Sequence, residues 1–285
     1  MAISITPLTD TIGAEVVGVD LSQDLDDRTR RLIYNAWVDN VVLVFHGQAL
    51  PPPDFIKAAR NFGAPMRQNL ESFDVPGFPD IGVVSNRDKD TTEDGKRDGK
   101  AYVRGVSWHS DHSYAEIPPK ATILYGIDIP SSGGDTQFCN TRAAYEALPE
   151  ETQRRIDALA VLHVYQSSRS PRKLIGRTAE EEGRYPGNVV HPLVRTNPDT
   201  GRKAIYLNPV RAERILDIGE AESGALLDQL TKHVTQPCFQ YRHKWRPGDL
   251  VIWDNRNAMH QANADYDMAE RRFLHRIMLE GERPD

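Results

Sequence analysis

The sequence predicts a mainly β fold with covering helices, either a β-sandwich or a jelly roll. Many short runs have the alternating or wholly apolar pattern of strands, and only a few longer stretches have helical periodicity. No internal repeat and no linker divides the chain, so we expect a single domain over residues 1–285. A chain of 285 residues is long enough to bury one large core.

The first quarter of the chain predicts two strands, a helix, a buried strand and a second helix. Strands are expected at residues 3–5 and 15–20, on either side of a turn at Gly13. Asp26 or Asp27 should cap a helix that ends near Asn40. The apolar run 41–45 fits a strand buried on both faces, and prolines 51–53 lead into a helix at 54–62. The inner face of the first helix is expected to carry Leu32, Ile33, Ala36 and Trp37.

The middle of the chain holds two polar stretches and a predicted hairpin. Residues 86–105 are too polar to bury a core, so they form either an active-site lid or an idle solvated insertion. A strand at 121–129 and a turn at 131–134 precede Thr141, the expected cap of a helix that begins at Arg142. A helix at 149–160, a loop or lid at 167–190 and a hairpin of 191–195 with 203–207 follow.

The last quarter predicts one helix and three strands. The helix covers 220–234, and the strands cover 239–245, 249–253 and 272–279. Leu226, Leu227 and Leu230 on that helix serve either the core or a subunit interface.

Composition excludes several classes of protein. The net charge of −6 and pI near 5.9 leave no basic excess to follow phosphates, so no nucleic-acid partner is expected. Cys139 and Cys238 do not form a close pair, which indicates free thiols in a reducing cytoplasm. The N-terminus lacks the pattern of a signal peptide, and no apolar run is long enough for a membrane helix.

The segment Trp108-His109-Ser110-Asp111 and the distant His260 form a candidate metal site. On a strand, His109 and Asp111 project to the same face, whereas His112 projects away from them. His260 comes 260 − 109 = 151 residues later and must arrive from another strand. Two imidazoles and one carboxylate are the facial ligand set of non-haem Fe(II) oxygenases. The His-x-Asp pair alone is weak evidence, but it gains weight from the Trp253-Asp254-Asn255-Arg256 run that precedes His260.

A second constellation predicts an anion site. Arg272, Leu274 and Arg276 share one face of the last predicted strand. A guanidinium inside a sheet is costly unless it meets an anion, and its planar fork matches a carboxylate. Thr136 can add a hydroxyl donor to the same anion. The alternative is a pair of exposed arginines on a strand edge.

The assembled motifs resemble those of the Fe(II)/2-oxoglutarate-dependent dioxygenases of the taurine/2,4-dichlorophenoxyacetate (TauD/TfdA) family. The resemblance covers nearly the whole chain in order and implies a double-stranded β-helix (jelly-roll) core. The matching pieces are residues 13–21, Trp108-His109-Ser110-Asp111, Gly133-Gly134-Asp135-Thr136, residues 143–148, residues 191–194 with 201–203, Trp253-Asp254-Asn255-Arg256 with His260, and Arg271-Arg272.

The resemblance also implies cofactors and residue roles. The cofactors are Fe(II), 2-oxoglutarate and O2, with succinate and CO2 as co-products. His109, Asp111 and His260 would hold the iron, and Thr136 and Arg272 would bind the distal carboxylate of 2-oxoglutarate. Arg276 would lie near the metal-chelating end of 2-oxoglutarate or near an anionic group of the substrate. Arg271 is the alternative carboxylate clamp, but the shared strand face of Arg272 and Arg276 favours Arg272.

The substrate is expected to be a small organic anion. Residues 138–145 and 241–250 look closer to the aryloxyacetate enzymes than to the taurine enzymes, and Gly105 stands where taurine enzymes place an Asn. Candidate substrate residues are Tyr102, Arg104 and Tyr206. Alternatives are an alkylsulfonate or sulfate-ester dioxygenase and a non-catalytic sensor of metal or 2-oxoglutarate. Halogenation is disfavoured, because a halogenase usually has a small residue where this chain has Asp111. A zinc hydrolase is disfavoured as well, because no obvious general base lies next to the His-x-Asp pair. The family resemblance also implies a dimer or tetramer.

Overall fold

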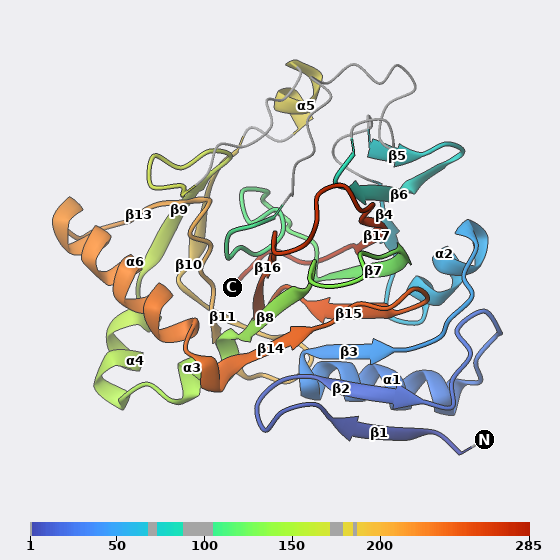
Figure 1. Cartoon of the computed structure of the whole chain (residues 1–285). Helices are drawn as coiled ribbons and strands as arrows, with labels where there is room; N and C mark the ends of the chain where they lie inside the picture. Colours follow the sequence, from blue (N-terminus) through green and yellow to red (C-terminus); the bar gives the residue numbers. More distant parts are fainter. Residues whose placement is uncertain (1, 68–72, 88–104, 172–178, 185–186) are drawn as a thin grey trace.

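The largest element of the fold is a nine-stranded sheet in the described part of the chain. The computed structural model describes residues 2–67, 73–87, 105–171, 179–184 and 187–285 (Figure 1). The strand order is β1-β2-β3-β15-β7-β17-β6-β5, with β4 paired to β17. The strands of this sheet are β1 (Ser4–Pro7), β2 (Ala14–Val17), β3 (Val42–Phe45), β4 (Pro65–Met66), β5 (Asp74–Val75), β6 (Phe78–Ser85), β7 (Ala121–Asp128), β15 (Leu250–Asp254) and β17 (Phe273–Leu279).

Three smaller sheets complete the β structure of the described residues. The sheet β14-β8-β16 lies opposite the large sheet, and the pair β11-β12 and the sheet β10-β9-β13 lie beside it (Figure 1). The mainly β fold with covering helices is therefore confirmed. The strands are β8 (Thr136–Asn140), β9 (Ala160–Val164), β10 (Asn188–Pro192), β11 (Val194–Thr196), β12 (Lys203–Ile205), β13 (Ala212–Ile215), β14 (Gln240–His243) and β16 (Ala258–Ala262).

Two helices cover the outer face of the large sheet. α1 (Asp27–Asn40) begins after Asp26, whose side chain accepts a hydrogen bond from the Thr29 amide at 2.7 Å. α2 (Pro52–Arg60) begins at the triple proline, where the missing amide hydrogens cost no helical bond. Buried Ile33 and Trp37 of α1 pack with the sheet, as expected. Leu32 does not: its side chain is 44% exposed, so its predicted place on the inner face is wrong.

Alternation along the strands separates two cores. On β7, Ile123 faces the helix-covered core, whereas Leu124 faces an inner core between the large sheet and the sheet β14-β8-β16. Phe138 of β8 enters the same inner core from the opposite side. A third core lies beneath α6 (Glu220–Val234), and it includes Leu226, Leu227 and Leu230, so these three leucines serve the core.

Several predicted boundaries differ from the structure. Asn140, not Thr141, caps α3 (Thr141–Glu146), because its side chain accepts from the Ala143 amide at 3.0 Å. The predicted helix 149–160 is shorter, since α4 (Glu150–Asp157) ends before Ala160 begins β9. The predicted hairpin forms between β11 and β12 only, because His191 and Pro192 belong to β10 and pair with β9.

The two predicted loops in the middle of the chain have different outcomes. The predicted loop 167–190 contains a helix, α5 (Ala179–Arg184), and the start of β10. The expected lid at 86–105 lies almost wholly outside the described residues. Within the part of the chain that is described, no helix combines the length and apolar character needed to cross a membrane.

The burial of His275 predicts that the folded protein becomes less stable as the pH falls. Its ring stacks on Phe55 at 6.4 Å, and burial lowers its pKa from 6.5 to about 4. The unfolded chain therefore takes up this proton first as pH falls, so the contribution of His275 to stability is present above pH 6.5 and is lost towards pH 4.

We expect His275→Leu to make the stability of the metal-free protein less dependent on pH. Between pH 6.5 and 4, the slope should decrease by up to about 1.4 kcal/mol per pH unit, the value of one proton. Urea unfolding at a series of pH values measures this slope. An unchanged slope would show that His275 gains its proton equally in both states.

Candidate metal centre

His109 and His260 are brought together by their own backbones. His260 lies on β16, and the two residues form an isolated antiparallel bridge. The His109 amide donates to the His260 carbonyl at 3.0 Å, and the His260 amide donates to the His109 carbonyl at 2.8 Å. Their ring centroids are 4.2 Å apart. Two imidazoles from distant parts of the chain are therefore held side by side.

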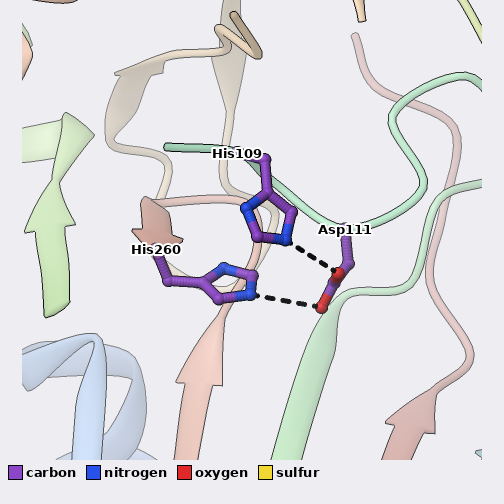
Figure 2. A group of neighbouring side chains, drawn as sticks. All are labelled: His109, Asp111 and His260. Carbon is purple, nitrogen blue, oxygen red and sulfur yellow. Dashed lines mark ion pairs between the residues drawn. The ribbon is translucent and has the colours of Figure 1, made fainter. Parts of the chain in front are cut away.

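Asp111 completes the cluster from a turn. The expected continuous strand through His109 and Asp111 does not form, because the chain turns at residues 111–114 and His112 has a φ of 47°. Both imidazoles nevertheless point at the carboxylate of Asp111 (Figure 2). Nε2 of His109 lies 3.8 Å from Oδ1 of Asp111, and Nε2 of His260 lies 3.8 Å from Oδ2. The predicted proximity is confirmed, although the predicted reason for it is not.

The donor set fits a divalent metal ion. Among the described residues, His109, Asp111 and His260 are the His, Cys, Asp or Glu side chains that lie close enough together to hold one metal ion. Their ligand atoms lie within 4.8 Å of one another. Nδ1 of His109 donates to the Ser107 carbonyl at 2.7 Å, because a carbonyl can only accept. This bond leaves the lone pair of Nε2 facing the cluster. Two nitrogens and one hard oxygen suit Fe(II).

The electrostatics keep the carboxylate ionised. Burial opposes ionisation of Asp111, but in the metal-free cluster the attraction to protonated His260 and His109 outweighs burial and holds the pKa of Asp111 below its usual range. Arg276 acts in the same direction. His112 stands apart from the three ligands, and burial lowers its pKa to about 3. It is therefore a neutral neighbour, consistent with its exclusion from the ligand set.

Arg272 and Thr136 meet in the inner core. Arg272 is 4% exposed, and its Nε donates to the Gly134 carbonyl at 2.8 Å. Its Nη2 lies 3.5 Å from Oγ1 of Thr136, which also accepts from Nε1 of Trp245 at 2.9 Å. Burial lowers the pKa of Arg272 to about 10. No carboxylate among the described residues lies within ion-pair distance of this guanidinium.

Arg271 has a different environment from Arg272. Its side chain is 35% exposed, lies 3.6 Å from the carboxylate of Asp128 and stacks over Phe273 at 4.1 Å. Arg276, the third arginine of this segment, is half-buried on β17, near enough to Asp111 to affect its pKa. The structure thus turns Arg272 and Arg276 inwards and Arg271 outwards.

Of the three candidate substrate residues, the structure describes Tyr206 alone. Tyr206 is 3% exposed, its ring stacks with His163 at 5.8 Å, and Arg195 lies 5.0 Å from its centroid. Burial raises the pKa of Tyr206 to about 12, so the phenol is neutral. Tyr102 and Arg104 lie outside the described residues.

Sequence reasoning missed the residues that support Asp111. Thr122 of β7 donates to Oδ2 of Asp111 at 2.6 Å. Asn208 donates to the Ser110 carbonyl at 2.6 Å and to Oγ of Ser113 at 2.8 Å, which fixes the turn on either side of Asp111. The pattern gave one weak indication, because a polar residue within an otherwise apolar strand needs a partner.

The sequence matches one family model over nearly its whole length. The model described as "Taurine catabolism dioxygenase TauD, TfdA family" matches residues 4–278. The chain belongs to this family. It is thereby an oxidoreductase of the dioxygenase class, and the predicted resemblance is confirmed.

Two relatives align with nearly the full length of this chain. An alpha-ketoglutarate-dependent 2,4-dichlorophenoxyacetate dioxygenase of Cupriavidus pinatubonensis is 35% identical over 97% of this chain and 97% of its own. An alpha-ketoglutarate-dependent sulfate ester dioxygenase of Pseudomonas putida is 34% identical over 100% of this chain and 91% of its own.

A solved structure confirms the fold class. The crystal structure of AAD-2 in complex with Mn(II) and N-oxalylglycine superimposes with a TM-score of 0.81 and 33% identity, over 100% of this chain and 99% of that one. Together with the two facing sheets described above, this similarity confirms the jelly-roll core.

Proposed function

We propose that the protein is an Fe(II)- and 2-oxoglutarate-dependent dioxygenase that hydroxylates a small organic anion. An aryloxyalkanoate is favoured, and succinate and CO2 are the co-products. The observation that carries the proposal is the cluster of His109, Asp111 and His260, with ligand atoms within 4.8 Å of one another in a member of this dioxygenase family. The chemistry of such a ligand set is the activation of O2 at iron.

The three clustered side chains would hold the iron, and it would supply the redox chemistry. His109 and His260 would bind through Nε2, the nitrogen that each turns towards Asp111. The protein contributes the rigid placement of the donors, since the backbone bridge fixes both imidazoles.

Arg272 and Thr136 are the proposed clamp for the distal carboxylate of 2-oxoglutarate. A buried guanidinium without an anionic partner is costly, so a dicarboxylate would relieve that cost on binding. The inward place of Arg272, the outward place of Arg271 and the 3.5 Å approach of Arg272 to Thr136 support this assignment. Arg276 would bind either the chelating end of 2-oxoglutarate or the anionic group of the substrate.

Arg276 has a testable role. We expect Arg276→Met to retain iron and to weaken the binding of one anion by about 10–100-fold, the value of a charge-assisted hydrogen bond. Steady-state measurements of KM for 2-oxoglutarate and for the substrate show which anion it binds. If both KM values are unchanged, Arg276 contacts neither.

The relatives support two substrate classes. One relative is named for 2,4-dichlorophenoxyacetate, an aryloxyalkanoate, and another for sulfate esters. We favour the aryloxyalkanoate and keep the sulfate ester or alkylsulfonate as the alternative. Tyr102, Arg104 and Tyr206 remain the proposed substrate residues. The family match argues against the non-catalytic sensor of metal or 2-oxoglutarate that the sequence left open.

The cellular setting is also proposed. Both cysteines are free, which fits a cytoplasmic location. We further propose a single domain over residues 1–285 and a dimer or tetramer. Light scattering of the purified protein measures the oligomeric state directly.

A substrate screen tests the function. The protein is loaded with Fe(II) under anaerobic conditions, mixed with 2-oxoglutarate and one small anion, and exposed to O2, and succinate is measured. The panel holds aryloxyacetates, aryloxypropionates, alkylsulfonates, sulfate esters and phosphonates. Succinate well above the uncoupled background with one class identifies the substrate class. Binding of 2-oxoglutarate without succinate from any anion would favour the sensor, and no binding would overturn the proposal.

A further inference from the structure

A chain of three buried hydrogen bonds ends on the carboxylate of Asp111. Nε1 of Trp253 donates to Oδ1 of Asn255 at 2.9 Å, and Nδ2 of Asn255 donates to Oγ1 of Thr122 at 2.9 Å. Oγ1 of Thr122 then donates to Oδ2 of Asp111 at 2.6 Å. We call Trp253, Asn255 and Thr122 the carboxylate relay.

The direction of every bond in the relay follows from the first donor. The indole N–H of Trp253 can only donate, so the atom of Asn255 that faces it must be the amide oxygen. The amide nitrogen of Asn255 therefore faces Thr122 and uses a lone pair of its hydroxyl. The single hydroxyl proton of Thr122 is left for Asp111. The relay is thus a one-way donor aimed at the carboxylate.

The backbone fixes the relay in place. Trp253 of β15 and Thr122 of β7 are register partners on neighbouring strands, so their side chains lie side by side on one face. Asn255 follows β15 directly, and its amide donates to the Lys120 carbonyl at 2.9 Å. Thr122, Trp253 and Asn255 are 0%, 1% and 3% exposed, so bulk water does not compete for these bonds.

The relay also touches a second candidate ligand. The ring of Trp253 packs against the imidazole of His260, with centroids 4.5 Å apart. One indole therefore contacts His260 through its ring and is linked to Asp111 through the hydrogen bonds of Asn255 and Thr122. Packing and hydrogen bonding of this kind set the orientation of metal ligands.

We propose that the carboxylate relay positions Asp111 for metal binding, with Thr122 as the last donor of the relay. This inference rests on the proposed iron site. The Thr122 hydroxyl engages Oδ2 and fixes the carboxylate plane, which favours Oδ1 for the metal.

Thr122 is accordingly a positioning residue, and its removal is the first test. Thr122→Val keeps the shape of the side chain but removes the donor. We expect the affinity for Fe(II), titrated anaerobically with the full-length protein, to fall by about 10–100-fold. At saturating Fe(II), the absorption band of the 2-oxoglutarate complex should also require more 2-oxoglutarate. Thr122→Ser, which restores the donor, should recover most of both losses.

A matched control separates the relay from a general effect of losing a hydroxyl. Thr235 lies just beyond α6, and its hydroxyl donates to the Thr231 carbonyl at 2.8 Å. Thr235→Val should leave both binding measurements at the wild-type values. Melting of the metal-free variants shows whether each change acts on the fold.

A double-mutant cycle tests whether the relay acts as one unit. Trp253→Phe keeps an aromatic ring against His260 but removes the N–H that orients Asn255, so Fe(II) affinity should fall by less than in Thr122→Val. The double variant should be no weaker than Thr122→Val alone, because the relay is already broken at its last bond. If Thr122→Val does not fold, the loss of affinity in Trp253→Phe alone carries the test.

The outcomes distinguish this inference from the proposed function. Wild-type protein that fails to bind Fe(II) or to give the 2-oxoglutarate band overturns the proposed function. Wild-type binding that is retained in Thr122→Val, or losses that simply add in the double variant, overturns the relay alone.

Discussion

Replacing His109 by alanine will remove iron and activity together. His109 supplies one of two imidazoles beside Asp111, with its Nε2 oriented by the bond from Nδ1 to the Ser107 carbonyl. Loss of a supporting residue typically costs 10–100-fold in metal affinity, so loss of a ligand should cost at least about 100-fold. Iron content after desalting and succinate formation are the two measurements.

A second histidine provides the control for this variant. His233 lies on α6, where its Nε2 faces the Ala144 carbonyl at 2.8 Å. His233→Ala should bind iron as the wild type does. If His109→Ala retains iron and full turnover, His109 is not a ligand and the proposed metal centre is wrong.

Replacing Arg272 by methionine will abolish tight binding of 2-oxoglutarate without destabilising the metal-free protein. The buried guanidinium has two bonds to neutral oxygens and no carboxylate partner among the described residues. Truncating one partner of a buried charged pair costs roughly 2–5 kcal/mol of binding, so the KM for 2-oxoglutarate should rise by at least about 30-fold. A methionine of similar length removes an unpaired buried charge, so the melting temperature should stay level or rise.

Arg271 is the matched control for Arg272. It is the neighbouring residue with the same chemistry, but it is half-exposed and faces Asp128. Arg271→Met should leave the KM for 2-oxoglutarate nearly unchanged. The reverse result, with a large effect at Arg271 and none at Arg272, would assign the clamp to Arg271.

The clustering of His109, Asp111 and His260 was predictable from their residue types. An imidazole and a carboxylate two residues apart, with a second imidazole behind a polar run, have few explanations other than a metal. The local geometry was not predictable. The turn at Asp111 depends on the positive φ of His112, and the sequence pattern gives no sign that a histidine adopts it.

The fold was predictable wherever the hydrophobic period was clear. The apolar run that became β3 is buried along its whole length, as its composition indicates. Leu32 was assigned to the wrong face because the sequence does not fix the width of the apolar face of a helix. Whether a residue at the border of that face is buried depends on the sheet that packs against it. The relay from Trp253 to Asp111 was beyond the reach of the pattern, because it depends on the register between β15 and β7.

The backbone bridge between His109 and His260 has a consequence for folding. It joins residues that are 260 − 109 = 151 positions apart, so it forms only after a very long loop has closed. Contacts of such long range form slowly, and half of an iron site has little affinity for the ion. Tight binding of iron should therefore require that this pairing has formed, so the metal would stabilise the native chain and not an early folding intermediate.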